Sequence, residues 1–146
     1  VVKYKYLGVW LTPQLSFRYH FEDRLRAAKA SIMANYSNIF SKNGVPISVK
    51  FEIFNAVARA IISYAAQTWG FLWSDVIESL NTFFIKRLFL LPKNTPSYVI
   101  YLESGLTPIF VFTLSLHYRY IRKVLTLPNT RLPKILAEQI IRRKIF

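Results

Sequence analysis

The chain contains no cysteine and only two histidines among its 146 residues. The lack of cysteine excludes disulfides, thiolate zinc sites and cysteine nucleophiles. His20 and His117 lie too far apart in the sequence to form an HExxH or a similar local metal-binding spacing. We therefore expect both histidines to be packed or hydrogen-bonded side chains rather than catalysts, and we expect no metal site within this chain.

Acidic residues and glycines are also few, with seven of the former and four of the latter. No Asp-Asp or Asp-x-Asp string is present to hold magnesium for phosphoryl transfer, and neither a P-loop nor a GxGxxG motif occurs. Glu22 and Asp23 are sequence neighbours, so on a helix their side chains point about 100° apart and do not converge. The sequence thus assigns no catalytic residue to this chain.

Long apolar runs are missing as well. Stretches free of charge do not exceed 15 residues, as in 60–74. A helix that crosses a bilayer needs roughly 18 to 20 apolar residues, so the sequence predicts no membrane span.

The chain is rich in hydrophobic residues and in positive charge. Hydrophobic residues make up 53% of the sequence and charged residues 18%, which predicts a folded domain with a core rather than disorder. Basic residues outnumber acidic ones by 20 to 7, for a formal net charge of +13. A positive field of this size favours an acidic partner, either phosphate backbones or anionic lipid.

The residue pattern predicts a mainly α fold, a helical bundle of about six helices with a small N-terminal β element. Alternating lysines and tyrosines over 2–12 favour a strand, within which Gly8 suggests a bend, a bulge or the close approach of another backbone. Helices are expected over about 17–41 after an N-cap at Ser16, over 48–69 and 74–91, after each Thr-Pro pair at 95–96 and 107–108, and over 133–146. We divide the chain into a β element at 1–15, a helical domain at 16–127 and a basic C-terminal helix at 128–146.

Basic side chains gather on one face of each of two expected helices, where a phosphate backbone could lie along them. Tyrosines accompany the second set, an arrangement that single strands and distorted duplexes favour. Two other interpretations stay open: a solvated helix face, and a membrane-surface or protein-docking helix with no nucleic-acid role. The two sets are Arg18, Arg26 and Lys29 on the first helix, and Arg119, Arg122 and Lys123 on the fifth.

Arg59 lies between two alanines on the most apolar of the expected helices. A buried cation is costly unless it is paired. Arg59 is therefore expected either to reach a carboxylate or to face a ligand groove.

A series of short motifs, taken in order, resembles the segment that follows the catalytic palm in reverse transcriptases of non-LTR (LINE-type) retrotransposons. Each motif is weak alone, but their order and spacing cover about residues 3–125. The motifs are Lys5-Tyr6-Leu7-Gly8-Val9, Leu15-Ser16-Phe17 with His20, Tyr64 and Trp69, Leu91-Pro92 with Thr95-Pro96, and Glu103, Gly105 and Pro108.

The resemblance implies that Tyr6, Leu7 and Gly8 form the primer grip, where backbone approaches the 3′ end of the primer. The helices that follow would be the thumb, which clamps an RNA/DNA hybrid or duplex by contacts to its phosphates. The family's paired aspartates lie upstream of the primer grip and are absent from this sequence. Polymerase activity, its Mg²⁺, the palm and the fingers would then belong to a longer, intracellular and nuclear parent protein.

Overall fold

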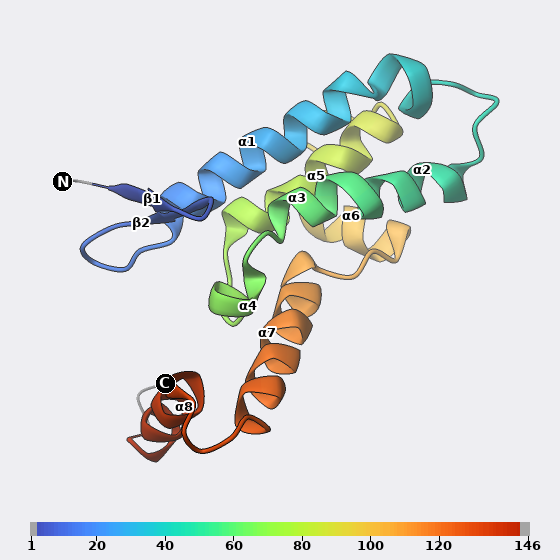
Figure 1. Cartoon of the computed structure of the whole chain (residues 1–146). Helices are drawn as coiled ribbons and strands as arrows, with labels where there is room; N and C mark the ends of the chain where they lie inside the picture. The colour runs from blue at the N-terminus through green and yellow to red at the C-terminus, as the bar shows by residue number, and fades with distance from the viewer. Residues whose placement is uncertain (1–2, 144–146) are drawn as a thin grey trace.

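The computed structural model describes residues 3–143, and within them the chain is mainly α-helical with a small N-terminal β element, as predicted (Figure 1). The strands are β1 (Tyr4–Tyr6) and β2 (Val9–Leu11). The longer helices are α1 (Arg18–Ala34), α5 (Asp75–Leu88), α7 (Ile109–Leu125) and α8 (Leu132–Arg142). The shorter ones are α2 (Ile47–Ile53), α3 (Ala60–Ile62), α4 (Ala66–Trp69) and α6 (Ser97–Ser104), with π-helical segments η1 (Tyr36–Phe40) and η2 (Phe54–Arg59).

The N-terminal strand region forms a hairpin. β1 and β2 pair antiparallel with Tyr6 opposite Val9, so Leu7 and Gly8 are the two turn residues. Both have positive φ, +45° and +82°, as a type I′ hairpin turn requires. Gly8 therefore turns the chain, and the predicted bend is confirmed.

The first helix follows its expected range, because α1 continues through η1 to Phe40. Its apolar stripe supplies core residues, with Ala28 and Ile32 buried. The predicted N-cap is wrong: Phe17 occupies the cap position, and no side chain caps the helix. Ser16 lies one residue further out, where its hydroxyl accepts a long bond of 3.4 Å from the Arg18 N–H.

The second helix does not run unbroken to Trp69, contrary to the prediction. It begins at Ile47, one residue before Ser48, and breaks after Ile62, with Ala65 in a left-handed conformation at φ +59°. The short helix α4 then turns away to pack against α7, where Gly70 lies against the Thr113 backbone. This tertiary contact interrupts an otherwise regular helical pattern.

Both helices expected after the Thr-Pro pairs exist, but each begins one residue later than predicted. Pro96 and Pro108 have extended ψ angles of 141° and 143° and so occupy the N-cap position. At α7 a distant side chain satisfies the first amides: the Glu78 carboxylate on α5 accepts the N–H groups of Ile109 at 3.1 Å and Phe110 at 2.6 Å. Gly105 ends α6 with φ +62°, as expected.

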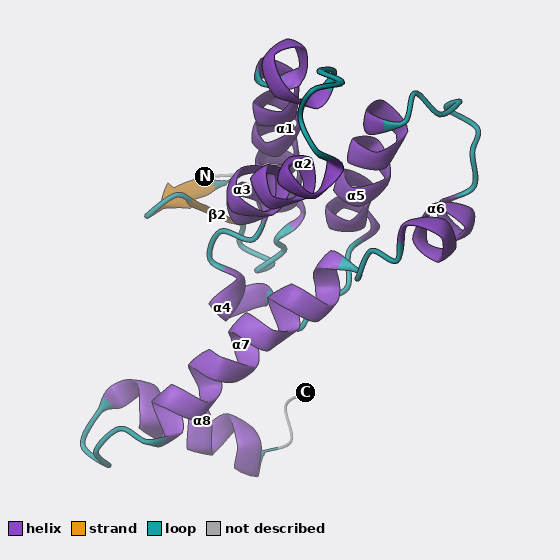
Figure 2. Cartoon of the chain, turned by 90° about the vertical axis from the view of Figure 1, so that its right-hand side faces the viewer, coloured by secondary structure: helices purple, strands orange, loops and turns teal. Residues whose placement is uncertain are grey.

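The structure has two regions, which we call the body and the arm. In the body, α1 packs against α3, η2 and α5 around the core, and α7 runs past α4 along its edge. The arm, residues 118–142, comprises the end of α7 and α8, and it projects from the body in both views (Figures 1 and 2). The expected C-terminal helix is α8, and positions 144–146 of that prediction lie outside the described residues.

Candidate nucleic-acid interface

The hairpin turn is exposed on one side and held on the other. Tyr6 is 56% exposed and Leu7 75%. The Leu7 carbonyl accepts a 2.7 Å hydrogen bond from the Tyr64 hydroxyl. A Cβ atom at Gly8 would lie only 3.0 Å from Cε1 of Tyr64, so the absence of a side chain lets this ring approach the turn. The predicted primer-grip residues thus form a fixed, solvent-facing turn.

Tyr64 also connects the turn to the buried aromatic core. The break after α3 leaves its carbonyl without the Thr68 N–H, which bonds to Ala65 instead. The Trp69 indole donates to the Tyr64 carbonyl at 3.0 Å, and Nε2 of His20 lies 3.2 Å from it. These bonds bring together positions 7, 20, 64 and 69, which are scattered in the sequence.

His20 is packed and hydrogen-bonded, as expected. It is fully buried beside the rings of Trp69 and Phe21. Burial lowers the pKa of His20 below its ordinary value of 6.5, against the opposing effect of the hydrogen bond to Tyr64. The imidazole is therefore neutral near pH 7 and donates Nε2–H to the Tyr64 carbonyl.

The predicted basic stripe lies on the outside of α1. Arg18 is exposed and pairs with Glu22 at 3.1 Å, so Glu22 does not pair with Arg26 as its spacing also allowed. Arg26 is exposed, and the half-buried Lys29 places Nζ 5.1 Å from the centre of the Phe83 ring on α5. The three cations lie on one helix, and the Phe83 ring on α5 contacts the last of them, Lys29.

Helix α5 adds a cation, Arg87, that the sequence pattern does not predict at this surface. The guanidinium of Arg87 lies 5.9 Å from the same Phe83 ring that Lys29 contacts. Phe83 and Arg87 are four residues apart and share a helix face, a spacing that could have drawn attention to the pair. Their approach to Lys29 depends on the packing of α5 against α1, which the pattern does not reveal.

The hairpin extends this positive surface at its other end. Nζ of Lys3 lies 4.4 Å from the centre of the Tyr19 ring on α1, and both Lys3 and Lys5 approach Trp10 at 5.2 Å. Cations held against ring faces keep their charge at the surface with their positions restricted. We call the combined surface the basic face; its cations are Lys3, Lys5, Arg18, Arg26, Lys29 and Arg87.

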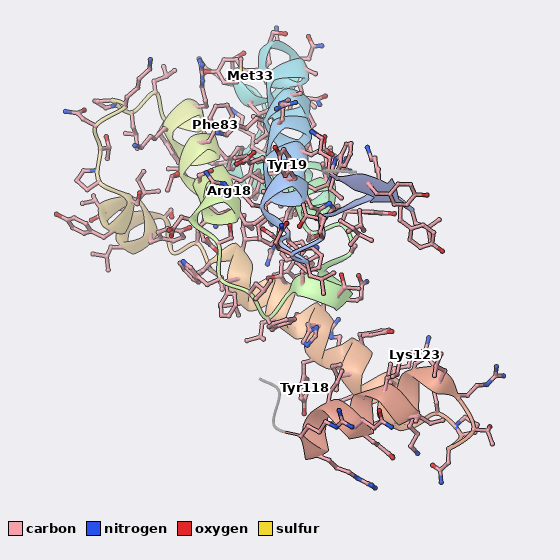
Figure 3. The ribbon with its side chains drawn as sticks, turned by 90° about the vertical axis from the view of Figure 1, so that its left-hand side faces the viewer. Arg18, Tyr19, Met33, Phe83, Tyr118 and Lys123 are labelled. Atoms are coloured by element: carbon pink, nitrogen blue, oxygen red, sulfur yellow. The ribbon has the colours of Figure 1, made fainter. Side chains whose placement is uncertain are left out.

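The second predicted set lies elsewhere. Arg119, Arg122 and Lys123 are exposed on the arm, with Arg122 6.0 Å from the ring of the exposed Tyr118. Figure 3 shows Arg18, Tyr19 and Phe83 on the body and Tyr118 and Lys123 on the arm, well apart. The structure therefore presents two separate basic surfaces and does not join the two predicted sets into one site.

Within residues 3–143, no group of three or more histidine and carboxylate side chains could hold a metal ion. No single helix of this part of the chain is long and apolar enough to cross a membrane, although α6 and α7 together, bent by 73°, have the length and composition. No protein-family model, curated protein or solved structure matches the chain.

Proposed function

We propose that this chain is the primer-grip and thumb segment of an RNA-directed DNA polymerase of the non-LTR retrotransposon type, and that it holds the template-primer duplex by contacts to phosphates. The observation that carries the proposal is the junction at Tyr64. Its hydroxyl bonds to the turn at Leu7, and its carbonyl lies beside His20 and Trp69. Positions 7, 20, 64 and 69, which carry part of the family resemblance in the sequence, thus lie together in the fold. Their proximity supports the proposal that this segment shares its ancestry with that family.

The basic face supports a role in backbone contact. From Arg18 to Lys29 it follows α1 for about 16 Å, because a helix rises about 1.5 Å per residue. This length matches about five phosphates of one duplex strand, which are spaced about 3.4 Å apart along the axis. Cations on an open helix surface position a duplex without reading its sequence.

Binding to an RNA/DNA hybrid across a salt series tests the proposal. Fluorescence anisotropy with a labelled hybrid should give an affinity that falls as salt rises and is similar for unrelated sequences. Each phosphate contact contributes a slope of about −0.9 in a plot of log affinity against log salt, so we expect a slope between about −3 and −6. A chain that does not bind at low salt, or whose binding is indifferent to salt, would refute backbone contact.

A double charge reversal locates the contact. Arg26→Glu with Lys29→Glu should weaken hybrid binding by about tenfold or more and reduce the salt slope by about 2, equally for all sequences. The matched control is Lys42→Glu with Lys93→Glu, which makes the same change in net charge at two exposed loop lysines that are not among the cations of the basic face. Equal losses for the two double variants would mean that net charge alone, and not the basic face, binds the hybrid.

The alternative, a membrane-surface or protein-docking module, draws support from α8. Leu132, Leu136 and Ile140 recur at four-residue spacing and are 65%, 48% and 39% exposed. An exposed aliphatic face flanked by cations is typical of helices that lie on anionic lipid. Co-sedimentation with anionic vesicles, measured in the same buffer as hybrid binding, separates the two functions; binding to vesicles alone would favour the alternative.

A further inference from the structure

Arg59 lacks an anionic partner in the described part of the chain. No ion pair forms at Arg59 within residues 3–143; its Nη1 donates to Asn55 Oδ1 at 3.3 Å, and its buried Nε has no hydrogen-bond acceptor there. The guanidinium stacks on the Phe112 ring of α7 at 4.0 Å. Burial lowers the pKa of Arg59, and the charge of Glu78 opposes this only through space. Arg59 was expected either to pair with a carboxylate or to face a ligand groove. Within residues 3–143 it does not pair with a carboxylate.

Arg59 does line a pocket. The pocket has a volume of about 190 Å³, and its polar lining includes Asn55, Asn81 and Thr107 as well as Arg59. Asn81 is almost fully buried, and its amide donates to the Thr107 carbonyl at 3.3 Å, which fixes one wall. This is a small polar compartment with one cation, room for a compact oxyanion, and walls held by hydrogen bonds.

A second, larger pocket of about 430 Å³ adjoins the first, and Asn55 lines both. The residues that line it include two aromatic ones, Tyr64 and Phe112, together with Gln67. This volume lies within the range of roughly 300–1,000 Å³ typical of small-molecule sites. Aromatic faces and amide groups are the surfaces on which proteins stack and hydrogen-bond unpaired bases.

We propose that the two pockets together bind one unpaired nucleotide, with its phosphate beside Arg59 in the smaller pocket and its base in the larger one. A guanidinium matches the planar pair of oxygens that a phosphate offers. A simple carboxylate would satisfy Arg59 but would leave the aromatic pocket empty. The site is built from η2, α3, α4, α5, α7 and the loop before α7, and none of its lining residues is a cation of the basic face, so it does not depend on duplex binding.

Side-chain NMR tests the proposal with three probes: AMP, inorganic phosphate and the dinucleotide ApA. The ¹H–¹⁵N signal of Arg59 Nε should shift saturably with AMP, at an affinity about tenfold or more above that of inorganic phosphate, because the base adds stacking. ApA distinguishes the sources of the phosphate: binding as tight as that of AMP assigns a strand, and AMP binding alone assigns a free nucleotide. Equal affinity for AMP and phosphate, or no saturable shift with any probe, overturns the proposal.

Two variants check the assignment of the pockets. Ala60 is exposed and lines the larger pocket, so Ala60→Trp should fill it without removing a core contact. The affinity for AMP should then fall to that for phosphate, about tenfold. The matched control Ala34→Trp, at an exposed position on α1, should bind AMP as the unmodified chain does. Arg26→Glu with Lys29→Glu should also leave AMP binding unchanged, so failure of this site and failure of hybrid binding are distinguishable.

Discussion

The body and the arm carry the same kinds of residues, basic and apolar, but the fold treats them differently. In the body, aliphatic side chains are buried and several cations rest on aromatic rings, as Lys29 does on Phe83. In the arm, α8 has no buried residue, and its leucines and isoleucines face solvent. A basic amphipathic pattern therefore predicts a helix in both regions, but it does not predict whether the apolar face of that helix becomes buried.

The largest expected difference between the regions is in stability. Ile32 is 1% exposed in the core of the body, so Ile32→Ala should lower the free energy of unfolding by about 3 kcal/mol. Leu136 is 48% exposed on the arm, and Leu136→Ala should cost less than about 1 kcal/mol. Urea unfolding measures both. Similar losses would show that the arm is packed in solution, and a dependence on protein concentration would then identify a second copy as its partner.

A somewhat smaller effect is expected at the root of the arm, where α4 meets α7. A Cβ atom at Gly70 would overlap the carbonyl oxygen of Thr113, so the two backbones meet without room for a side chain. Gly70→Ala should lower the free energy of unfolding by about 2 kcal/mol through forced separation of the helices. Gly44→Ala is the matched control, because no atom lies within 4 Å of the added methyl group. A tolerated Gly70→Ala would mean that α7 is not fixed to the body at this point.

The helices were predictable because local apolar spacing decides them. The stripe through Phe21, Ala28 and Ile32 required only the helical period and no knowledge of a partner. The break after Ile62 was not predictable, since no glycine or proline occurs between Ile62 and Trp69 and the chain turns where α4 packs against α7. Propensity is a weak guide wherever tertiary packing opposes it.

The candidate site divides in the same way into residues that local spacing predicts and residues that only the packing of elements brings together. The stripe on α1 follows from spacing within one helix, and the structure leaves Arg18 and Arg26 exposed and Lys29 half-buried there. The meeting of Arg87 with Lys29 at the Phe83 ring depends on the packing of α1 against α5, and the pockets beside Arg59 depend on the contact of η2 with α7. Such contacts have no signature in a single sequence, so these residues appear only once the fold is known.

The smallest expected effect is a pH dependence confined to the body, since the arm contains no histidine. His20 is neutral in the folded protein because burial lowers its pKa, whereas in the unfolded chain it titrates near 6.5. The neutral form therefore contributes stability that is complete above about pH 6.5 and is lost as the pH falls through the lowered pKa of His20. The nearest charges, Arg24 and Asp23, act on it in opposite directions, so burial decides the sign.

Urea unfolding at about pH 7.5 and pH 5.5 measures this loss. In His20→Gln the amide can still donate to the Tyr64 carbonyl but cannot titrate in this range, so the difference between the two pH values should shrink. The hairpin should report the same event, because the carbonyl that His20 contacts belongs to the residue whose hydroxyl holds Leu7. Backbone amide exchange at Val9 and Leu11 should accelerate at the lower pH in the unmodified chain more than in His20→Gln, after correction for the intrinsic exchange rate. If both proteins lose stability equally on acidification, then carboxylates rather than His20 cause the loss of stability at low pH. That result would also contradict the proposed coupling between protonation of His20 and the hairpin turn.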